Sequence, residues 1–208
     1  MISIEAALEI ILSEIRPLGT ESLPLLSALD RVLAEDIVAS RPNPPWDNSA
    51  MDGYAVKEKD TLGASKNAPV ILKVIADIPA GSVCRKILKG GEAIRIMTGA
   101  ACPRSADAVV MVEHTERLAE SGVKIFREAK AGDNIRRVGE DYKIDDILIK
   151  ACHIIRPAEI AILASAGVAY VNVYQRPRVA VLSTGDELVD IHEGLAEGKI
   201  VNSNSYAL

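Results

Sequence analysis

Small polar side chains crowd into one stretch of the sequence, D-N-S-A-M-D-G-Y at residues 47–54. Two carboxylates, an amide and a hydroxyl lie within six residues there, and such oxygen donors suit a hard cation or a polar ligand. Asp52 and Gly53 also form a common turn signal, so a structural turn is the competing interpretation. Asp52 and Ser49 are the candidate site residues of this stretch.

A second candidate lies at residues 95–100, R-I-M-T-G-A. The sequence predicts a strand that ends in Thr98 and Gly99, where a hydroxyl and exposed backbone N–H groups could hold an oxyanion. A turn that simply ends the strand would use the same residues. One such loop decides little by itself.

The segment N-I-R-R-V-G-E-D at residues 134–141 places two guanidinium groups beside two acids. Paired arginines suit bidentate recognition of phosphate or molybdate-like oxyanions. Arginines and acids this close could instead neutralise one another at a domain junction. The residues alone leave both interpretations open.

The fourth candidate, S-T-G-D-E at residues 183–187, follows the apolar run V-A-V-L at 179–182. Such a run is typical of a strand buried on both faces of an α/β sheet, and ligands bind beyond the carboxyl ends of those strands. Capping of a following helix is the alternative. Asp186 and Glu187 would repel a phosphate, and a bridging Mg²⁺ would resolve that conflict.

Helical patterns flank these candidates. Apolar residues from Ile4 to Ile15 recur on one helix face, with Ser3 placed as the cap and Pro17 beyond the end. A short second helix is predicted to start at Ser27. A third runs from Pro157 to its terminator Gly167.

Three prolines in residues 41–46 indicate extended backbone and a domain boundary. Beyond them, short β-type runs predict a small antiparallel sheet. These runs are Val70–Ile75, Ala93–Met97, Ala108–Val112, Val123–Phe126 and Ile144–Ile149. A further strand is predicted at 168–173. Fewer residues follow Glu187 than the roughly 30 that a crossover unit takes, so we expect the chain to stop within a domain.

Composition excludes several classes of protein. The net charge of −5 gives no basic footprint for nucleic acid, and one Trp and one Phe offer little base stacking. No apolar stretch reaches the roughly 20 residues of a membrane span, and the acidic N-terminus is unlike a signal peptide. Three cysteines without C-x-x-C spacing argue against disulfides or a zinc site and favour the cytoplasm. The isolated histidines are interpreted as structural or exposed: His114, His153 and His192.

Taken together, four motifs in one order resemble the MoeA/gephyrin-type molybdopterin molybdenumtransferase family. The motifs are P-x-x-D-N-S-A-M-D-G-Y-A-V (44–56), R-I-M-T-G-A (95–100), N-I-R-R-x-G-E-D (134–141) and S-T-G-D-E-L (183–188). The resemblance covers essentially the whole chain, although family members are much longer. Their later loops, which carry much of the pterin and molybdate site, have no counterpart here, so we expect this chain to be inactive alone.

The resemblance implies an enzyme of molybdenum cofactor biosynthesis. Molybdate would be inserted into adenylylated molybdopterin (molybdopterin-AMP), with Mg²⁺-dependent release of AMP. By motif position, Asp52, Thr98 and Glu187 would be catalytic, and Asp52 and Glu187 would hold the metal. The implied substrate-binding residues are Ser49, Arg136, Asp141, Thr184, Gly185 and Asp186.

The resemblance also implies an α+β multidomain fold and an elongated homodimer in which Asp52 of one copy meets Glu187 of the other. The expected parts are an N-terminal helix region packing with the third domain (1–26), an elongated linker domain (27–45 and 142–177), a β-rich inserted domain (46–141) and the truncated start of a Rossmann-like molybdopterin-binding domain (178–208). Expected partners are molybdopterin adenylyltransferase and molybdoenzyme maturation proteins, without nucleic acid or membrane.

Two other functions compete. Gephyrin-like relatives use this architecture as a non-enzymatic scaffold, which could lose its site acids, whereas this sequence keeps Asp52, Thr98 and Glu187. A molybdopterin adenylyltransferase would share the third-domain fold, but the motifs at 47–53 and 95–100 resemble the insertion-step family. The sequence leaves open whether molybdate or tungstate is preferred.

Overall fold

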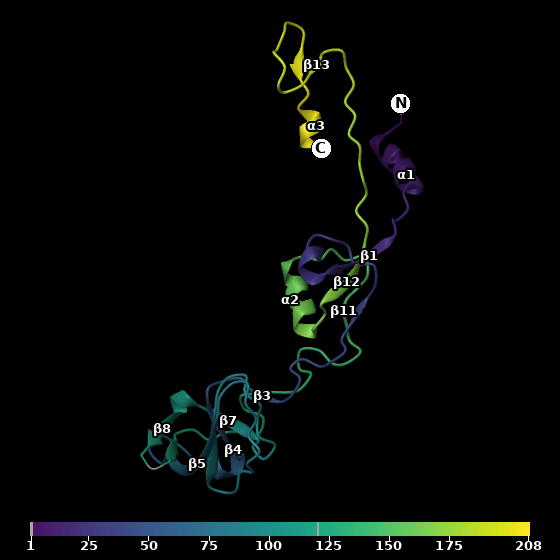
Figure 1. Cartoon of the computed structure of the whole chain (residues 1–208). Helices are drawn as coiled ribbons and strands as arrows, with labels where there is room; N and C mark the ends of the chain where they lie inside the picture. The colour runs from purple at the N-terminus through teal and green to yellow at the C-terminus, as the bar shows by residue number, and fades with distance from the viewer. Residues whose placement is uncertain (1, 120) are drawn as a thin grey trace.

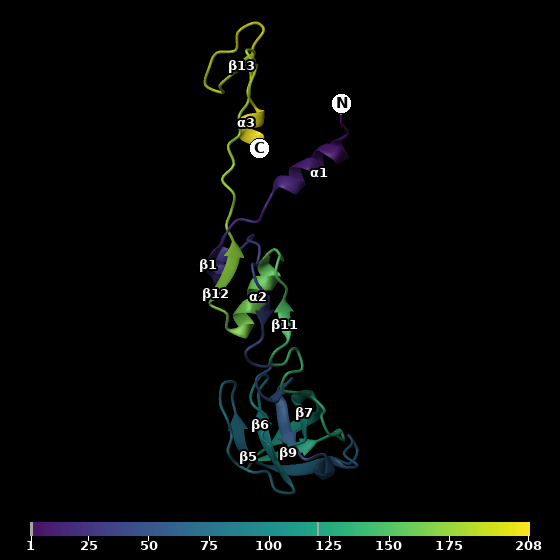
Figure 2. The ribbon, with the colours of Figure 1, turned by 90° about the vertical axis from the view of Figure 1, so that its right-hand side faces the viewer.

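The computed structural model describes residues 2–119 and 121–208. The chain is elongated, and three parts follow one another along its length (Figure 1). We call them the end segment (178–208), the middle unit (20–41 and 143–174) and the β-rich unit (46–138). The turned view keeps the same order, with the N-terminal helix beside the end segment (Figure 2). The predicted α+β class is confirmed.

The N-terminal helix α1 (Ile4–Glu14) confirms the predicted first helix. Ser3 caps it, because its hydroxyl accepts a hydrogen bond from the backbone N–H of Ala6 at 3.2 Å. None of its residues is buried, and apolar side chains such as Leu8 and Ile11 remain exposed. The amphipathic pattern has therefore built a helix whose apolar face nothing in the described residues covers.

The middle unit holds two antiparallel strand pairs around helix α2. Its elements are β1 (Thr20–Pro24), η1 (Leu25–Ala28), β2 (Ile37–Val38), β11 (Ile147–Ile149), α2 (Pro157–Ala166) and β12 (Tyr170–Tyr174). β1 pairs with β12 and β2 with β11, so residues 20–24 pair here rather than lying with α1. α2 begins at Pro157 and ends at Gly167, whose φ of 79° is left-handed, as predicted. Leu33, Ile155 and Leu163 are fully buried in its core.

The short helix predicted from Ser27 is wrong. A 3-10 turn, η1, ends at Ala28, and Asp30 adopts a positive φ of 60°. Val32 and Leu33 then form isolated β-bridges with Ile154 and Val173. Leu33 is fully buried where it meets these distant segments, and tertiary packing of this kind overrides weak local propensity.

Two segments cross side by side between the middle and β-rich units, at residues 42–45 and 139–142. The backbone N–H of Asn43 donates to the carbonyl of Tyr142, and that of Gly139 donates to the carbonyl of Pro44, both at 2.9 Å. The prolines of the first segment keep it extended. The chain therefore leaves the middle unit and returns to it along one narrow crossing.

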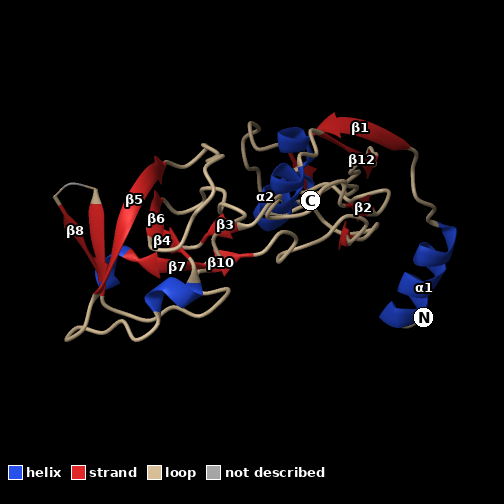
Figure 3. Cartoon of the chain, turned by 90° about the horizontal axis from the view of Figure 1, so that it is seen from below, coloured by secondary structure: helices blue, strands red, loops and turns tan. Residues whose placement is uncertain are grey.

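The β-rich unit is built on a curled six-stranded sheet in the order β7-β4-β6-β5-β9-β8 (Figure 3). Its strands are β4 (Gly53–Val56), β5 (Val70–Ile78), β6 (Glu92–Ile96), β7 (Ala108–Met111), β8 (Thr115–Leu118) and β9 (Gly122–Ile125). The purely antiparallel sheet that we predicted is wrong, because β5 and β6 are parallel. The long connection at 79–91 returns the chain to the end of the sheet where β5 began, so that β6 can run parallel to β5. A tight hairpin can join only antiparallel strands.

The last predicted β run, 144–149, is also misplaced. Only Ile147–Ile149 is a strand, and it pairs with β2 in the middle unit. Shorter elements complete the β-rich unit: β3 (Asn48–Ser49), η2 (Glu58–Thr61), η3 (Val112–His114) and β10 (Ile135–Arg136). β3 and β10 pair with each other at the edge where the chain enters and leaves.

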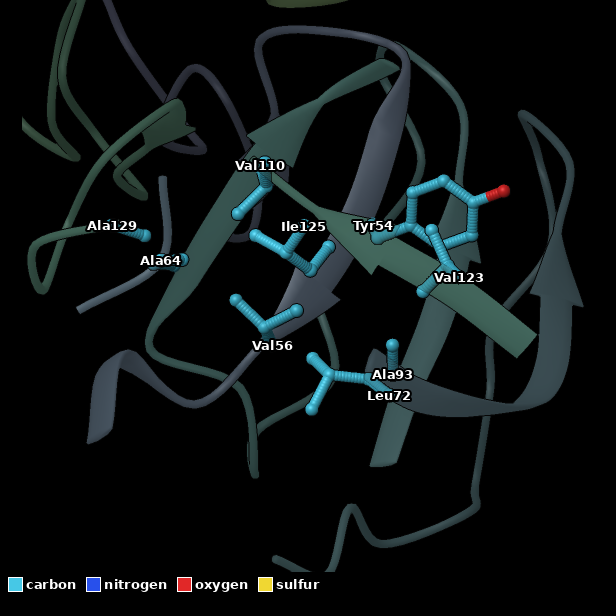
Figure 4. Close-up of a cluster of buried hydrophobic side chains, with 10 residues drawn as sticks. Tyr54, Val56, Ala64, Leu72, Ala93, Val110, Val123, Ile125 and Ala129 are labelled. Atoms are coloured by element: carbon cyan, nitrogen blue, oxygen red, sulfur yellow. The ribbon is translucent and has the colours of Figure 1, made fainter. Parts of the chain in front are cut away.

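Successive strand residues point to opposite faces of the sheet, and apolar side chains cover both faces. One face packs Tyr54, Val56, Val110 and their neighbours into a cluster from which the Tyr54 hydroxyl points away (Figure 4). The other face buries Ile94, Ile96 and further apolar residues. The loops that carry the candidate site are thus anchored on a packed sheet.

The end segment does not contain the predicted buried strand at 179–182. Val179 is 78% exposed and Leu182 is 88% exposed, and neither lies in a strand. A buried strand needs neighbouring strands, and the described residues supply none for this run. The segment instead holds a parallel pair, β13 (Leu188–Val189) with β14 (Ile200–Val201), and α3 (Asn204–Ala207). None of the described helices has the length and apolar content needed to cross a bilayer.

Candidate functional site

Asp52 and Thr98 meet at one end of the β4–β6 pair. Strand pairing places Gly53 opposite Ile96, so the residue before β4 lies beside the loop that follows β6. The Oδ1 atom of Asp52 accepts two hydrogen bonds, from the backbone N–H and from the hydroxyl of Thr98, each at 2.7 Å. Two residues from separate candidate motifs therefore form one polar site.

The Asp52 carboxylate is kept ionised. The backbone N–H of Thr98, then its hydroxyl, and the charge of Arg95 lower the pKa of Asp52. The side chain is exposed, and no described residue donates a hydrogen bond to Oδ2. One carboxylate oxygen is thus fixed by Thr98 while the other faces solvent.

Ser49 holds the loop that carries Asp52. The side chain is buried, its hydroxyl donates to the carbonyl of Met51 at 2.5 Å, and its oxygen accepts from the backbone N–H of Met51. Its backbone bonds to Ala100 at 3.0 Å and to Gly99 at 2.8 Å. Ser49 therefore ties the Asp52 loop to the Thr98 loop, and its hydroxyl is already engaged inside the structure.

The two arginines of the third motif differ in their surroundings. Arg137 forms an ion pair with Asp47 at 2.7 Å, and Asp47 also accepts from the backbone N–H of Val138 at 2.8 Å. The N–H of Val138, and after it Arg137, lower the pKa of Asp47. Arg136 lies exposed on β10, opposite Asn48, with no side-chain hydrogen bond to another described residue. Of the two, Arg136 has the guanidinium open to a ligand.

Asp141 lies in the crossing rather than beside Asp52. Its carboxylate accepts from the side-chain amide of Asn43 at 2.8 Å, and its backbone N–H donates to the carbonyl of Asn43 at 2.9 Å. The arginines and acids of the third motif form no ion pair with one another in the described residues, because Arg137 pairs with Asp47 and Asp141 binds Asn43. A substrate-binding role for Asp141 stays a prediction.

The fourth motif lies far from the first two. Thr184, Gly185, Asp186 and Glu187 immediately precede β13, at the opposite end of the molecule from the β-rich unit (Figure 1). One copy of the chain therefore does not bring Glu187 to Asp52. Within residues 2–119 and 121–208, no three His, Cys, Asp or Glu side chains are grouped to hold a metal ion.

Sequence reasoning missed two residues that the structure places at or near this site. Asp47 was noted only as one donor in a polar stretch, although it joins that stretch to Arg137. Arg95 was overlooked, although it lies close enough to affect Asp52 and pairs with Asp77 at 3.1 Å.

Comparisons with known proteins agree with one another. Residues 2–167 match the family described as "MoeA N-terminal region (domain I and II)". A molybdopterin molybdenumtransferase of Staphylococcus aureus is 41% identical over 203 residues, covering 98% of this chain and 48% of that protein. One of the same name from Bacillus subtilis is 42% identical, covering 89% and 44% respectively. The chain thus spans about half the length of these curated relatives.

A solved structure shows the same fold. The molybdopterin biosynthesis MoeA protein of Pyrococcus horikoshii OT3 superimposes with a TM-score of 0.89 at 37% sequence identity. The superposition covers 100% of this chain and 55% of that one.

Proposed function

This chain belongs to the MoeA family, whose N-terminal region it carries, and we propose that it supplies half of a molybdopterin molybdenumtransferase active site. The proposed reaction inserts molybdate into adenylylated molybdopterin and releases AMP in the cytoplasm. The observation that supports it is the Asp52–Thr98 pair, which holds an ionised carboxylate with one oxygen open to solvent.

The chemistry of this transfer needs groups that the chain offers. Molybdate is an oxyanion that must lose oxygen atoms to bind sulfur, and donors placed at such oxygens stabilise developing charge. The exposed guanidinium of Arg136 suits this task, whereas Thr98 directs its hydroxyl to Asp52. We therefore assign Thr98 the task of orienting Asp52, and Arg136 that of holding the oxyanion.

The free oxygen of Asp52 fits a hard cation, since Mg²⁺ is usually held by one or two carboxylates and several waters. When bound, the ion would polarise a phosphoryl oxygen. A second carboxylate would come from elsewhere, because the described part of one copy groups no three His, Cys, Asp or Glu side chains to hold a metal ion. We propose Glu187 of a second copy, with Asp186 and Thr184 lining the substrate beside it. A homodimer then follows from the incomplete site in each copy.

The end segment is proposed to begin a Rossmann-like pterin-binding domain, and the β-rich unit to be an insertion in the linker domain. Because this chain covers about half of its relatives, we expect the 208-residue chain alone to be inactive. Molybdopterin adenylyltransferase and molybdoenzyme maturation proteins are the proposed partners. A non-enzymatic scaffold requires neither Asp52 nor Glu187. Replacing these two acids therefore distinguishes the enzyme from the scaffold.

Subunit complementation tests the proposal. The chain is fused to the C-terminal half of the Bacillus subtilis relative, and Asp52→Asn and Glu187→Gln are made separately. We expect each variant to lose molybdenum insertion. When the two variants are mixed, about half of the dimers contain one subunit of each kind, and one of the two sites in such a dimer is intact. The mixture should therefore recover about a quarter of the native activity. Activity in either single variant, or no recovery in mixed dimers, would overturn the cross-subunit site.

A further inference from the structure

A groove of about 1120 Å³ opens on the β-rich unit, and none of the residues to which a catalytic or binding role is proposed above lines it. Its walls are residues 45–47, 83–87 and 101–106, together with Ile135, Arg137 and Val138. We call it the Trp46 groove. Its floor is apolar, because Cys84 and Cys102 pack against the core on that side of the sheet.

Large apolar side chains on the walls of the groove face solvent. Trp46 is 54% exposed, and Val83 and Ile87 are each 75% exposed. Single exposed apolar residues are ordinary, but several around one hollow mark a binding surface. Tryptophan in particular is enriched where a partner is bound.

The charge of the groove is opposite to that of the chain. Arg85, Lys86, Arg104 and Arg137 line it, whereas Asp47 is its single carboxylate and is already paired with Arg137. The whole chain carries a net charge of −5. An acidic partner is therefore attracted to this surface, and a basic one is not.

One wall offers backbone groups as well. Residues 83–87 belong to no strand, and none of their backbone N–H groups donates to another described residue. The segment is fixed just beyond its ends, where the N–H of Leu88 donates to the Ser105 hydroxyl at 2.8 Å and that of Ser82 to the Pro79 carbonyl at 3.1 Å. Backbone donors left open in this way can pair with an added strand.

We propose that the Trp46 groove docks an extended acidic peptide segment of a partner protein. The peptide backbone pairs with residues 83–87, an apolar side chain packs beside Trp46, and its acids face Arg85 and Arg104. This mode uses the three features of the groove together: backbone donors, exposed apolar rims and positive charge. A compact small molecule would leave most of the backbone N–H groups of residues 83–87 without a partner.

Trp46 itself provides the assay, because it is the single tryptophan of the chain. Its fluorescence is recorded while three capped peptides are added separately: the acidic-apolar peptide DEVLEDE, its basic analogue KKVLKKK, and DESSEDE, which lacks the apolar pair. We expect DEVLEDE to bind, to weaken as salt is raised, and to exceed both analogues in affinity by about tenfold or more. Methylating alternate backbone nitrogens of DEVLEDE removes strand pairing and should abolish binding.

Charge reversal locates the contact. Arg85→Glu and Arg104→Glu should each weaken DEVLEDE binding about tenfold. The matched control Lys66→Glu, an exposed cation on another loop, should leave it unchanged. Equal binding of acidic and basic peptides, or equal binding by Arg85→Glu and the control, overturns the proposal. Self-association of the chain that Arg85→Glu removes would assign the groove to a second copy instead, which also overturns it.

Discussion

Gly53 is the glycine at which adding a single methyl group should destabilise the fold most. A Cβ atom added there would lie 2.0 Å from the carbonyl oxygen of Val110, and real Cβ atoms stay at least 3.0 Å away. The obstacle is backbone, so it cannot rotate aside. In Gly53→Ala, β7 must therefore move away from β4, which it pairs with from Gly53 to Val56.

The cost of Gly53→Ala can be worked from that displacement. Two backbone hydrogen bonds of the β4–β7 pair would be lost or stretched, at about 1 kcal/mol each. Overpacking adds about 1–3 kcal/mol. Replacing glycine returns about 0.5–1 kcal/mol by restricting the unfolded chain. The net loss is about 3 kcal/mol, a large part of the 5–15 kcal/mol that typically stabilises a protein.

Urea unfolding followed by Trp46 fluorescence measures this loss, since Trp46 lies in the β-rich unit. Gly90→Ala is the matched control in the same unit, because its nearest atom, Oδ1 of Asp60, would be 3.8 Å away, an ordinary contact. We expect Gly53→Ala to lower the free energy of unfolding strongly and Gly90→Ala to change it by less than about 0.5 kcal/mol. Equal stability of the two variants would refute the close approach of β4 and β7.

Three further outcomes are expected. Burial raises the pKa of the Cys102 thiol to about 11, so an alkylating reagent at mildly basic pH should modify exposed Cys152 well before Cys102, as peptide mass mapping will show. Gly99→Ala should cost about 1 kcal/mol in urea unfolding, because Gly99 has a φ of 79° and no atom within 4 Å of the added methyl, which leaves only backbone strain. Arg156 lowers the pKa of Glu159 from 4.5 to about 2, so its contribution to stability is complete above pH 4.5 and lost as the pH falls toward 2. The difference in stability between the native chain and Glu159→Gln should therefore shrink over that range, and a constant difference would contradict the assignment.

Local sequence predicted those elements whose ends are set by neighbouring residues. Ser3 caps α1 through the N–H three residues on, and Pro157 and Gly167 bound α2. Strands β5, β6, β7 and β9 were predicted to within a few residues, because runs rich in β-branched residues between turn signals indicate strands, whereas β8 (Thr115–Leu118) was not predicted. The misplaced helix at Ser27 lacked such a signal, since its apolar residues serve bridges to residues 154 and 173.

The candidate residues came from the motifs, whereas the contacts between them came from the structure. Motif order identified Asp52 and Thr98 as candidates, and the structure places them in direct contact. Nothing in either motif shows that contact, because it follows from the β4–β6 register across 46 positions. The pairing of Asp47 with Arg137 spans a still longer separation. Glu187 lies at the far end of one copy, so the role proposed for it would require a second copy.

The sequence by itself determined the α+β class, the ends of α1 and α2, and the four motifs that mark the family. Those features depend on backbone preferences and hydrogen bonds within a few residues, which local sequence encodes directly. The tertiary structure alone decided the parallel β5–β6 pair, the union of Asp52 with Thr98 and the positively charged Trp46 groove. Each of these joins residues far apart in the chain, and what brings such residues together is burial of a shared core, a non-directional force that no short stretch specifies.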